Sequence, residues 1–198
     1  MKLLFLDTEF TNFIGTELIS IGLVSEDGQE FYCEISDYNK KLSSQFVKDV
    51  VEPKLNLQKF GVSKTEASAR LFTWLEELAE DHKICIDYDG DWELLLDLLE
   101  DLPGNIEEKP LFLNQYLVVK TTIKAHNLQV GDYVRFFTTS LQLFEDEFKN
   151  YFNENPDPGV HHALEDAKAN KYGYSKVISW LDVQNNSNGS SSDIAISV

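Results

Sequence analysis

Cysteine and long hydrophobic runs are both scarce in this sequence. The two cysteines, Cys33 and Cys85, lie among apolar residues in predicted strands and show no CxxC spacing. We therefore expect reduced cysteines in the core rather than a disulfide or a zinc site. No stretch approaches the roughly 20 apolar residues that span a bilayer, and the apolar run after Lys2 soon ends at an acid. These absences predict a cytoplasmic protein without a signal peptide or a membrane span.

Basic residues are also few. There are 17 lysines and arginines against 34 acidic residues, so the formal charge is −17, and such a field discourages loose binding to nucleic acid or anionic membranes. The lysines form no stripe, since the nearest candidates are Lys40-Lys41, Lys120 and Lys124. The charge does not exclude a nucleic-acid substrate that bound metal ions hold locally.

The remaining composition is that of a globular protein. Hydrophobic residues make up 42% and aromatic residues 12% of the chain, which is enough for a packed core. With 198 residues the chain is expected to form one domain, residues 1–182. Residues 183–198 are predicted to be a flexible tail, because Asn185 to Ser192 is rich in asparagine, serine and glycine.

The order of strand and helix patterns predicts an α/β fold with a mixed sheet. The hairpin signal Asp27-Gly28 separates two of the strands, and the first three strands are expected to form an antiparallel meander. The predicted strands are Leu3–Leu6, Glu17–Val24, Glu30–Ile35 and Lys83–Tyr88. Two further segments, Leu111–Leu113 and Leu117–Val119, fit either a strand or a buried helix, and Gly131-Asp132 indicates a turn.

Helices are predicted between and after these strands. Ser63 and Glu66 form a capping box that opens one of them. Pro53 is expected to end another, and a tight turn at Asp89-Gly90 to precede a third. The predicted helices are Ser43–Val51, residues 64–79, Asp91–Leu99, Leu141–Phe152 and His162 to about Leu181.

Two carboxylates follow the first predicted strand, because the apolar run stops at Asp7 and Glu9 comes two residues later. Side chains two apart on a strand point the same way, so the two carboxylates are expected to lie close together. Unpaired, they would repel each other and one would hold a proton. A divalent cation removes this repulsion, and oxygen ligands suit Mg²⁺ or Mn²⁺. For this pair taken alone, solvated residues at a strand end are the more common interpretation.

A second candidate group follows the Pro/Gly loop near residue 158. Here a helix is predicted to begin with histidine just before it and Asp166 in its second turn. The small residues Ala163, Ala167 and Ala169 allow this helix to approach the sheet closely. Asp166 could then meet Asp7 and Glu9 and complete a metal site. A histidine in the approach to the helix could accept a proton from water there.

A further acid is expected from the middle of the chain, where Asp87, Asp89 and Asp91 cluster after the fourth strand. We favour Asp91, because it opens a helix with its carboxylate in the N-terminal turn. Its ordinary interpretation is a first-turn residue that the helix dipole stabilises. Asp87 and Asp89 remain alternatives.

Three segments taken in this order resemble the DEDDh group of the DEDD exonuclease superfamily. They are Asp7-Thr8-Glu9-Phe10, the acid that opens a middle helix, and His161-His162-Ala163-Leu164-Glu165-Asp166-Ala167. The stretch Leu18–Val24 before Glu26-Asp27-Gly28 looks like the small bacterial exoribonuclease-like branch of that group. The resemblance covers about residues 1–180 and implies a ribonuclease-H-like three-layer fold. It also implies 3′→5′ exonuclease activity on single-stranded nucleic acid, with RNA favoured over DNA, and a possible homodimer.

The same resemblance implies a role for each matching residue. Two divalent ions, Mg²⁺ or Mn²⁺, would be bridged by Asp7, while Glu9 and Asp166 hold the first ion and Asp91 supports the site through water. His161 would be the general base, with His162 as its alternative. Contacts to the terminal nucleotide would come from Thr8, Phe10 and Phe13. For both phenylalanines, packing in the core is the competing expectation.

The middle segment departs from the family, because it lacks the usual His-Asn-x-x-Phe-Asp pattern and offers three competing aspartates. Two other functions also fit the sequence. One is a catalytically silent nucleic-acid-binding protein of the same fold. The other is a nuclease that trims free dinucleotides or acts on other phosphodiesters.

Overall fold

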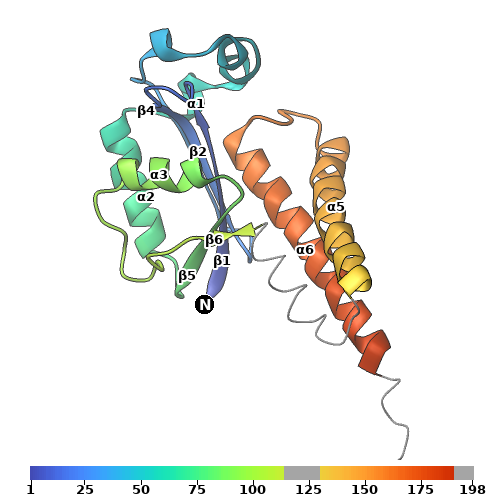
Figure 1. Cartoon of the computed structure of the whole chain (residues 1–198). Coiled ribbons are helices and arrows are strands. Elements are labelled where there is room, and N and C mark those ends of the chain that lie inside the picture. Colours follow the sequence, from blue (N-terminus) through green and yellow to red (C-terminus); the bar gives the residue numbers. More distant parts are fainter. Residues whose placement is uncertain (114–129, 190–198) are drawn as a thin grey trace, which may run out of the picture.

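A six-stranded mixed sheet lies at the centre of the computed structural model, which describes residues 1–113 and 130–189 (Figure 1). The strand order is β4-β3-β2-β1-β5-β6. Neighbours are antiparallel from β1 to β3 and parallel at the remaining pairs, which confirms the predicted meander. The strands are β1 (Lys2–Phe10), β2 (Leu18–Ser25), β3 (Glu30–Ile35), β4 (Gly61–Val62), β5 (His82–Ile86) and β6 (Leu111–Phe112). The predicted segment Leu117–Val119 lies outside the described residues.

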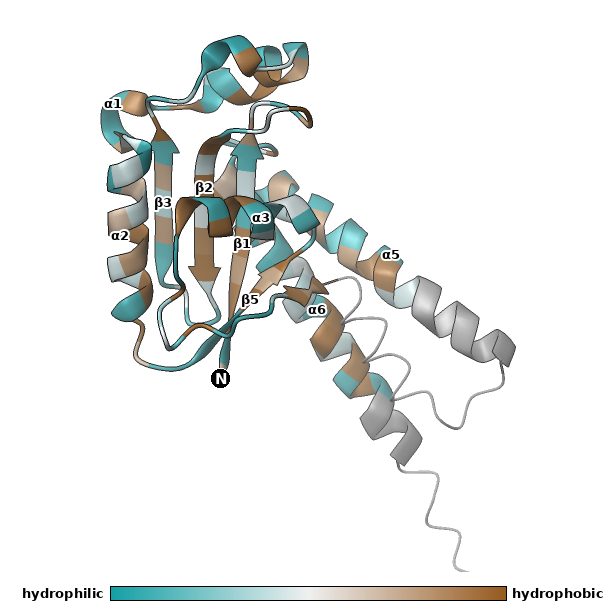
Figure 2. Cartoon of the chain, turned by 60° about the vertical axis from the view of Figure 1, so that its left-hand side comes forward, coloured by the Kyte–Doolittle hydropathy of each residue, from teal (hydrophilic) through white to brown (hydrophobic). Residues whose placement is uncertain are grey.

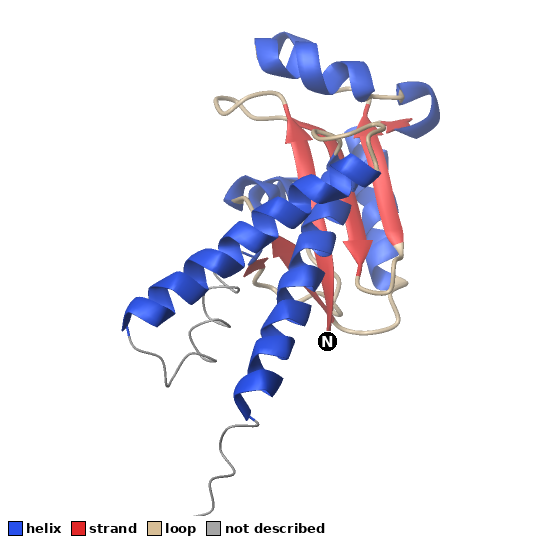
Figure 3. Cartoon of the chain, turned by 90° about the vertical axis from the view of Figure 1, so that its right-hand side faces the viewer, coloured by secondary structure: helices blue, strands red, loops and turns tan. Residues whose placement is uncertain are grey.

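Helices cover both faces of this sheet, so the protein has three layers (Figures 1 and 3). On one face, α2 (Lys64–Glu76) packs against β3, and α3 (Asp89–Leu98) packs against β1 and β5. On the other face, α6 (Ala163–Gly189) lies along β1 and β2, and α5 (Val130–Glu154) packs on α6. Short helical turns cap one end of the sheet: η1 (Lys40–Leu42), η2 (Val47–Val51), η3 (Glu52–Lys54) and α1 (Leu57–Phe60).

Two predicted helix-end signals are only partly confirmed or are wrong. The Ser63 side chain accepts a hydrogen bond from Glu66 N at 3.2 Å, as the capping box requires. The Glu66 carboxylate, however, pairs with Arg70 one turn further on, so the reciprocal half of the box is not made. Pro53 lies inside η3 and does not end the helical segment.

The other differences concern helices that extend further than predicted. The predicted turn at Asp89-Gly90 is the first turn of α3, because the backbone already becomes helical after Tyr88. Similarly, Gly131-Asp132 lies within α5. α6 runs to Gly189, so the first residues of the segment predicted to be a tail are helical.

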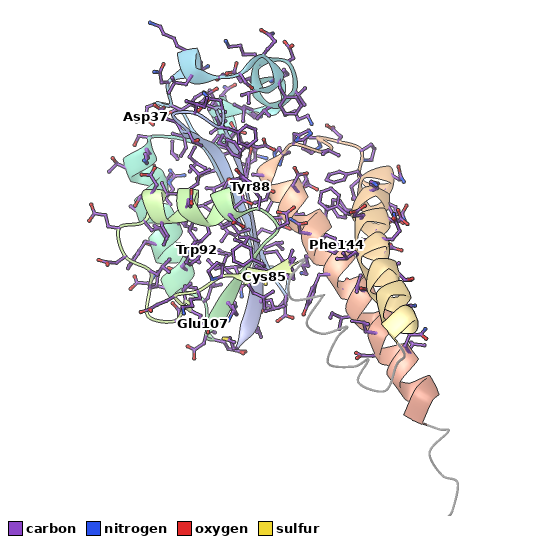
Figure 4. The ribbon with its side chains drawn as sticks, in the orientation of Figure 1. Asp37, Cys85, Tyr88, Trp92, Glu107 and Phe144 are labelled. Carbon is purple, nitrogen blue, oxygen red and sulfur yellow. The ribbon has the colours of Figure 1, made fainter. Side chains whose placement is uncertain are left out.

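The hydrophobic core is divided by the sheet into two clusters. Leu4 and Leu6 of β1 face the α2 and α3 layer, whereas Phe5 between them faces the α5 and α6 layer with Phe144. Figure 2 shows the hydrophobic residues along the central strands, and Figure 4 labels Phe144 and Cys85 of the second cluster. Both cysteines are buried thiols, as predicted. None of the helices in the described part of the chain is long and apolar enough to cross a membrane.

Candidate metal centre

Asp7 and Glu9 lie within β1, which continues four residues beyond the apolar run from which it was predicted. The strand is prolonged because β2 pairs with it as far as Phe10, with Asp7 opposite Gly22 and Glu9 opposite Ser20. Both acids alternate in step with Phe5, whose side chain faces α5 and α6. The two carboxylates therefore leave the carboxyl-terminal half of β1 on that face.

The start of α6 lies directly over this part of the sheet. A Cβ atom at Gly22 would lie 2.3 Å from the backbone nitrogen of Leu164, so only glycine fits beneath the helix here. The three small residues that were predicted to allow this approach, Ala163, Ala167 and Ala169, are fully buried. Close packing brings Asp166, in the first turn of α6, to the carboxylates of β1.

Two adjacent groups of potential metal ligands result. In the first, single ligand atoms of Glu9, His161 and Asp166 all lie within 4.8 Å of one another. In the second, Asp7, Asp87 and Asp91 meet the same criterion. All five residues predicted to be catalytic are thus brought to one place: Asp7, Glu9, Asp91, His161 and Asp166. Asp87 joins Asp91 as a middle acid, whereas Asp89 belongs to neither group.

Asp91 is fixed in place by Thr8 of β1. The Thr8 backbone N–H and hydroxyl both donate to Asp91 Oδ1, at 3.1 and 2.6 Å. The other oxygen, Oδ2, is buried and has no hydrogen-bond partner among the described residues. A buried oxygen without a donor is costly unless something else satisfies it. The Thr8 N–H and hydroxyl both already donate to Asp91. The predicted contact of Thr8 with a substrate stays a prediction.

The electrostatics of the two groups favour a bound cation. Burial, followed by repulsion from neighbouring carboxylates, raises the pKa of Glu9 to about 8 and that of Asp7 well above its ordinary value. Burial also raises the pKa of Asp91 and of Asp166 to about 7. Without a cation, these carboxyl groups therefore keep their protons to a higher pH than ordinary ones do. Since a divalent cation would replace those protons, the donor set and the unpaired Asp91 oxygen fit Mg²⁺ or Mn²⁺.

His161 lies beside the acids, and its backbone has a conformation that is rare for residues other than glycine. Its φ is +66°, in the left-handed region, and its N–H donates to the two Asp166 carboxylate oxygens at 2.9 and 3.3 Å. Burial and the positive charge of Lys54 lower the pKa of His161, which keeps its imidazole neutral near pH 7. Lys54 Nζ also donates to the carbonyl of Val160. Nothing in the sequence had pointed to Lys54.

His162, the alternative base, has different surroundings. Its ring stacks on that of Tyr32 of β3, with the centroids 4.5 Å apart and the planes at 24°. It belongs to neither group of potential ligands. His161 is therefore the histidine that the structure brings to the acids.

A pocket of about 520 Å³ is lined by the acids and by several aromatic rings, among them Phe10, Phe13 and Tyr88. Phe10 stacks on Tyr88 with centroids 6.0 Å apart, and Phe13 meets Tyr88 edge-on at 6.4 Å. Phe13 is 78% exposed, so the alternative expectation that it packs in the core is wrong. Phe10 lines the pocket and also packs on the core. Tyr88, which Figure 4 labels beside the start of α3, and Phe46 were missed because single aromatic residues near loops carry no periodic signal.

The site thus combines hard oxygen ligands, a neutral imidazole and flat apolar walls. Such a pocket can hold an anionic group through metal ions while rings of the same ligand stack on the walls. No family model matches the chain, and no curated protein matches its sequence.

Proposed function

We propose that this protein is a metal-dependent 3′→5′ exonuclease of the DEDDh type with a ribonuclease-H-like fold. It would hydrolyse single-stranded nucleic acid from the 3′ end, with RNA favoured. The observation that carries the proposal is the convergence in one pocket of Asp7, Glu9, Asp91, His161 and Asp166, which come from β1, α3, α6 and the loop before α6. The three-layer arrangement around a mixed sheet supports it as well.

The two ligand groups suit two cations side by side. Glu9 and Asp166 would hold one, while Asp7, Asp91 and Asp87 would hold the other. When bound, such ions lower the pKa of water and neutralise charge on a phosphate during in-line displacement. Asp87 is an addition to the ligand set that the sequence resemblance implied.

His161 is assigned as the general base. Its backbone N–H is bound to Asp166, so the ring is held next to a metal ligand. Its lowered pKa leaves a ring nitrogen free to accept a proton at neutral pH, which is what a general base requires. His162 is occupied by its stacking on Tyr32 and is not assigned this role.

The aromatic walls supply the contacts to the substrate. Phe10, Phe13 and Tyr88 present ring faces and edges beside the acids, and nucleobases stack on such rings with little dependence on sequence. No lysine or arginine lines the described pocket. With a formal charge of −17, the protein would therefore bind a short 3′ end through its metal ions rather than a long backbone through basic side chains.

The test uses a 5′-labelled single-stranded RNA and the matching DNA, incubated with Mg²⁺ or Mn²⁺. We expect a descending ladder of products that disappears in EDTA and in the Asp7→Ala variant, with RNA degraded faster. An intact substrate under every metal condition would overturn the proposal. If metal-dependent RNA binding persisted in that case, the catalytically silent binding protein would be the better interpretation.

A further inference from the structure

The loop that carries the candidate base, residues 160–162, is held by a network of contacts that no sequence feature indicated. Within this histidine loop, Val160 accepts a hydrogen bond from Lys54 and His162 stacks on Tyr32. The two contacts come from different elements, η3 and β3. Both lead back to the same buried side chain, that of Glu34.

Glu34 lies on β3 and is completely buried. Its Oε1 atom accepts a hydrogen bond from the Tyr32 hydroxyl at 3.0 Å and another from Asn56 N at 2.8 Å. The first bond orients the ring on which His162 stacks. The second anchors the chain two residues after Lys54, at the start of α1. Glu34 therefore connects both supports of the histidine loop.

Burying the Glu34 side chain in this way is energetically unfavourable. A buried carboxylate is normally paired with a cation or hydrogen-bonded at both oxygens. Here both donors bind the same oxygen, and Oε2 has no partner among the described residues. A neutral apolar residue would fill this position at lower cost, but it would release Tyr32 and Asn56 together.

We propose that Glu34 is a positioning residue for the reaction: it fixes the histidine loop through Tyr32 on one side and through the segment that carries Lys54 on the other. This inference rests on the proposed function, because it assigns His161 as the group to be positioned. Glu34 itself does not line the pocket. Its influence on catalysis is therefore through His161 and not through the substrate.

Two substitutions of Glu34 distinguish the role of its hydrogen-bond acceptor from that of its charge. Glu34→Gln keeps an oxygen that can accept from both Tyr32 and Asn56, whereas Glu34→Leu keeps the approximate volume and removes the acceptor. Asn105→Ala serves as the control for general destabilisation. Asn105 donates to the carbonyls of Leu75 and Leu78 at 2.8 and 3.2 Å, near the start of β5 and away from the site.

The first readout is amide hydrogen exchange, which requires no activity. In Glu34→Leu we expect faster exchange in residues 54–62 and 159–163 and unchanged exchange in β5. Glu34→Gln should match the wild type, and Asn105→Ala should leave residues 159–163 unchanged. Unchanged exchange of residues 159–163 in a folded Glu34→Leu protein would overturn the inference.

The second readout is the kinetics of RNA degradation. Since a displacement of about 1 Å can reduce a rate about 100-fold, we expect kcat of Glu34→Leu to fall roughly 10- to 100-fold with KM nearly unchanged. Glu34→Gln should restore most of kcat. An equal loss in Glu34→Gln and Glu34→Leu would contradict the role as a hydrogen-bond acceptor. If the wild type degrades no substrate, the proposed function fails, while hydrogen exchange still decides whether Glu34 holds the loop.

Tyr32 provides the same test at a less buried position, should Glu34→Leu not fold. Tyr32→Phe keeps the ring and loses the bond to Glu34, whereas Tyr32→Leu also removes the surface on which His162 stacks. The His162 ring protons should lose their ring-current shift in the NMR spectrum of Tyr32→Leu and show a smaller change in Tyr32→Phe. Identical His162 spectra in the wild type and Tyr32→Leu would refute the support of the loop by β3.

Discussion

Gly22 of β2 and Leu164 of α6 are in such close contact that a methyl group at residue 22 would lie 2.3 Å from the Leu164 backbone nitrogen. Because Gly22 pairs with Asp7, this contact sets the distance between α6 and the first candidate metal ligand. We expect Gly22→Ala to lower the free energy of unfolding by about 2–3 kcal/mol, since backbone atoms can only escape by moving the whole helix. Urea denaturation measures the loss.

Gly104→Ala is the matched control, because a Cβ at Gly104 meets nothing within 4 Å. It should leave the stability nearly unchanged. Gly22→Ala should also weaken Mg²⁺ binding, since Asp166 moves with α6. Equal stability of the two alanine variants would contradict the close contact between Gly22 and α6.

Asp7→Asn should separate stability from metal binding. Asp7 is surrounded by Asp91, Asp166, Asp87 and Glu9, and its charge is unfavourable until a cation is bound. In EDTA at about pH 8 we therefore expect the variant to melt at a higher temperature than the wild type. Calorimetric titration should show that its Mg²⁺ affinity is at least about tenfold lower, since a charged ligand has been lost.

The control for this experiment is Asp89→Asn, an exposed residue of the first turn of α3 that belongs to neither ligand group. Its melting temperature and Mg²⁺ affinity should stay close to those of the wild type. A lower melting temperature for metal-free Asp7→Asn would contradict the repulsion inferred at the site.

Stability without metal should fall as the pH rises. The folded-state pKa values of about 8 for Glu9 and about 7 for Asp91 and Asp166 lie above the unfolded values near 4, so folding is favoured by bound protons. The contribution is complete below about pH 4 and is lost as the pH rises through 7 to 8. Since one pKa unit corresponds to about 1.4 kcal/mol, the decrease between about pH 5 and pH 9 should be on the order of several kcal/mol.

Urea denaturation in EDTA across this pH range measures the decrease, and Mg²⁺ should reverse most of it at about pH 8. A metal-free stability that stays constant or increases over the same range would be incompatible with carboxylates whose pKa is raised.

Thr8→Val tests whether the Thr8 hydroxyl orients the Asp91 carboxylate. The substitution keeps the shape of a buried side chain and removes the hydroxyl that donates to Asp91 Oδ1 at 2.6 Å. We expect a loss of about 1–3 kcal/mol, the usual cost of a hydrogen bond to a charged group. Metal affinity should fall as well, because Asp91 is no longer oriented. An unchanged Mg²⁺ affinity would place Asp91 outside the metal site.

His161→Asn and His162→Phe distinguish the two neighbouring histidines. His161→Asn should reduce kcat about 10²- to 10⁴-fold, which is the usual contribution of a general base. His162→Phe retains a ring that can stack on Tyr32 and should keep the rate within a few-fold of wild type. Single-turnover RNA hydrolysis compares the two, and a larger loss in His162→Phe would exchange their roles.

The central strands and the main helices could be predicted because their apolar patterns are local. β1 was predicted too short for the same reason. Its last residues, from Asp7 to Phe10, are held in the strand by pairing with β2, and pairing of distant segments leaves no local pattern. α3 was predicted to begin too late because Asp89-Gly90 is a common turn signal that tertiary packing overrides.

The candidate site was only partly predictable from the sequence. Residues with an unusual type and spacing, such as Asp7, Glu9 and Asp166, could be recognised one segment at a time. Asp87 and Lys54 contribute through positions that depend on how β5 and η3 meet the other elements. Glu34 looks like any acid in a half-exposed strand, and only the fold reveals that it is fully buried.

The candidate site draws on both helical layers, because Asp91 comes from α3 on one face of the sheet and Asp166 from α6 on the other. During synthesis, β1 and α3 emerge from the ribosome long before Asp166 is added. A growing chain therefore has no complete site until α6 has been made and has docked above Gly22.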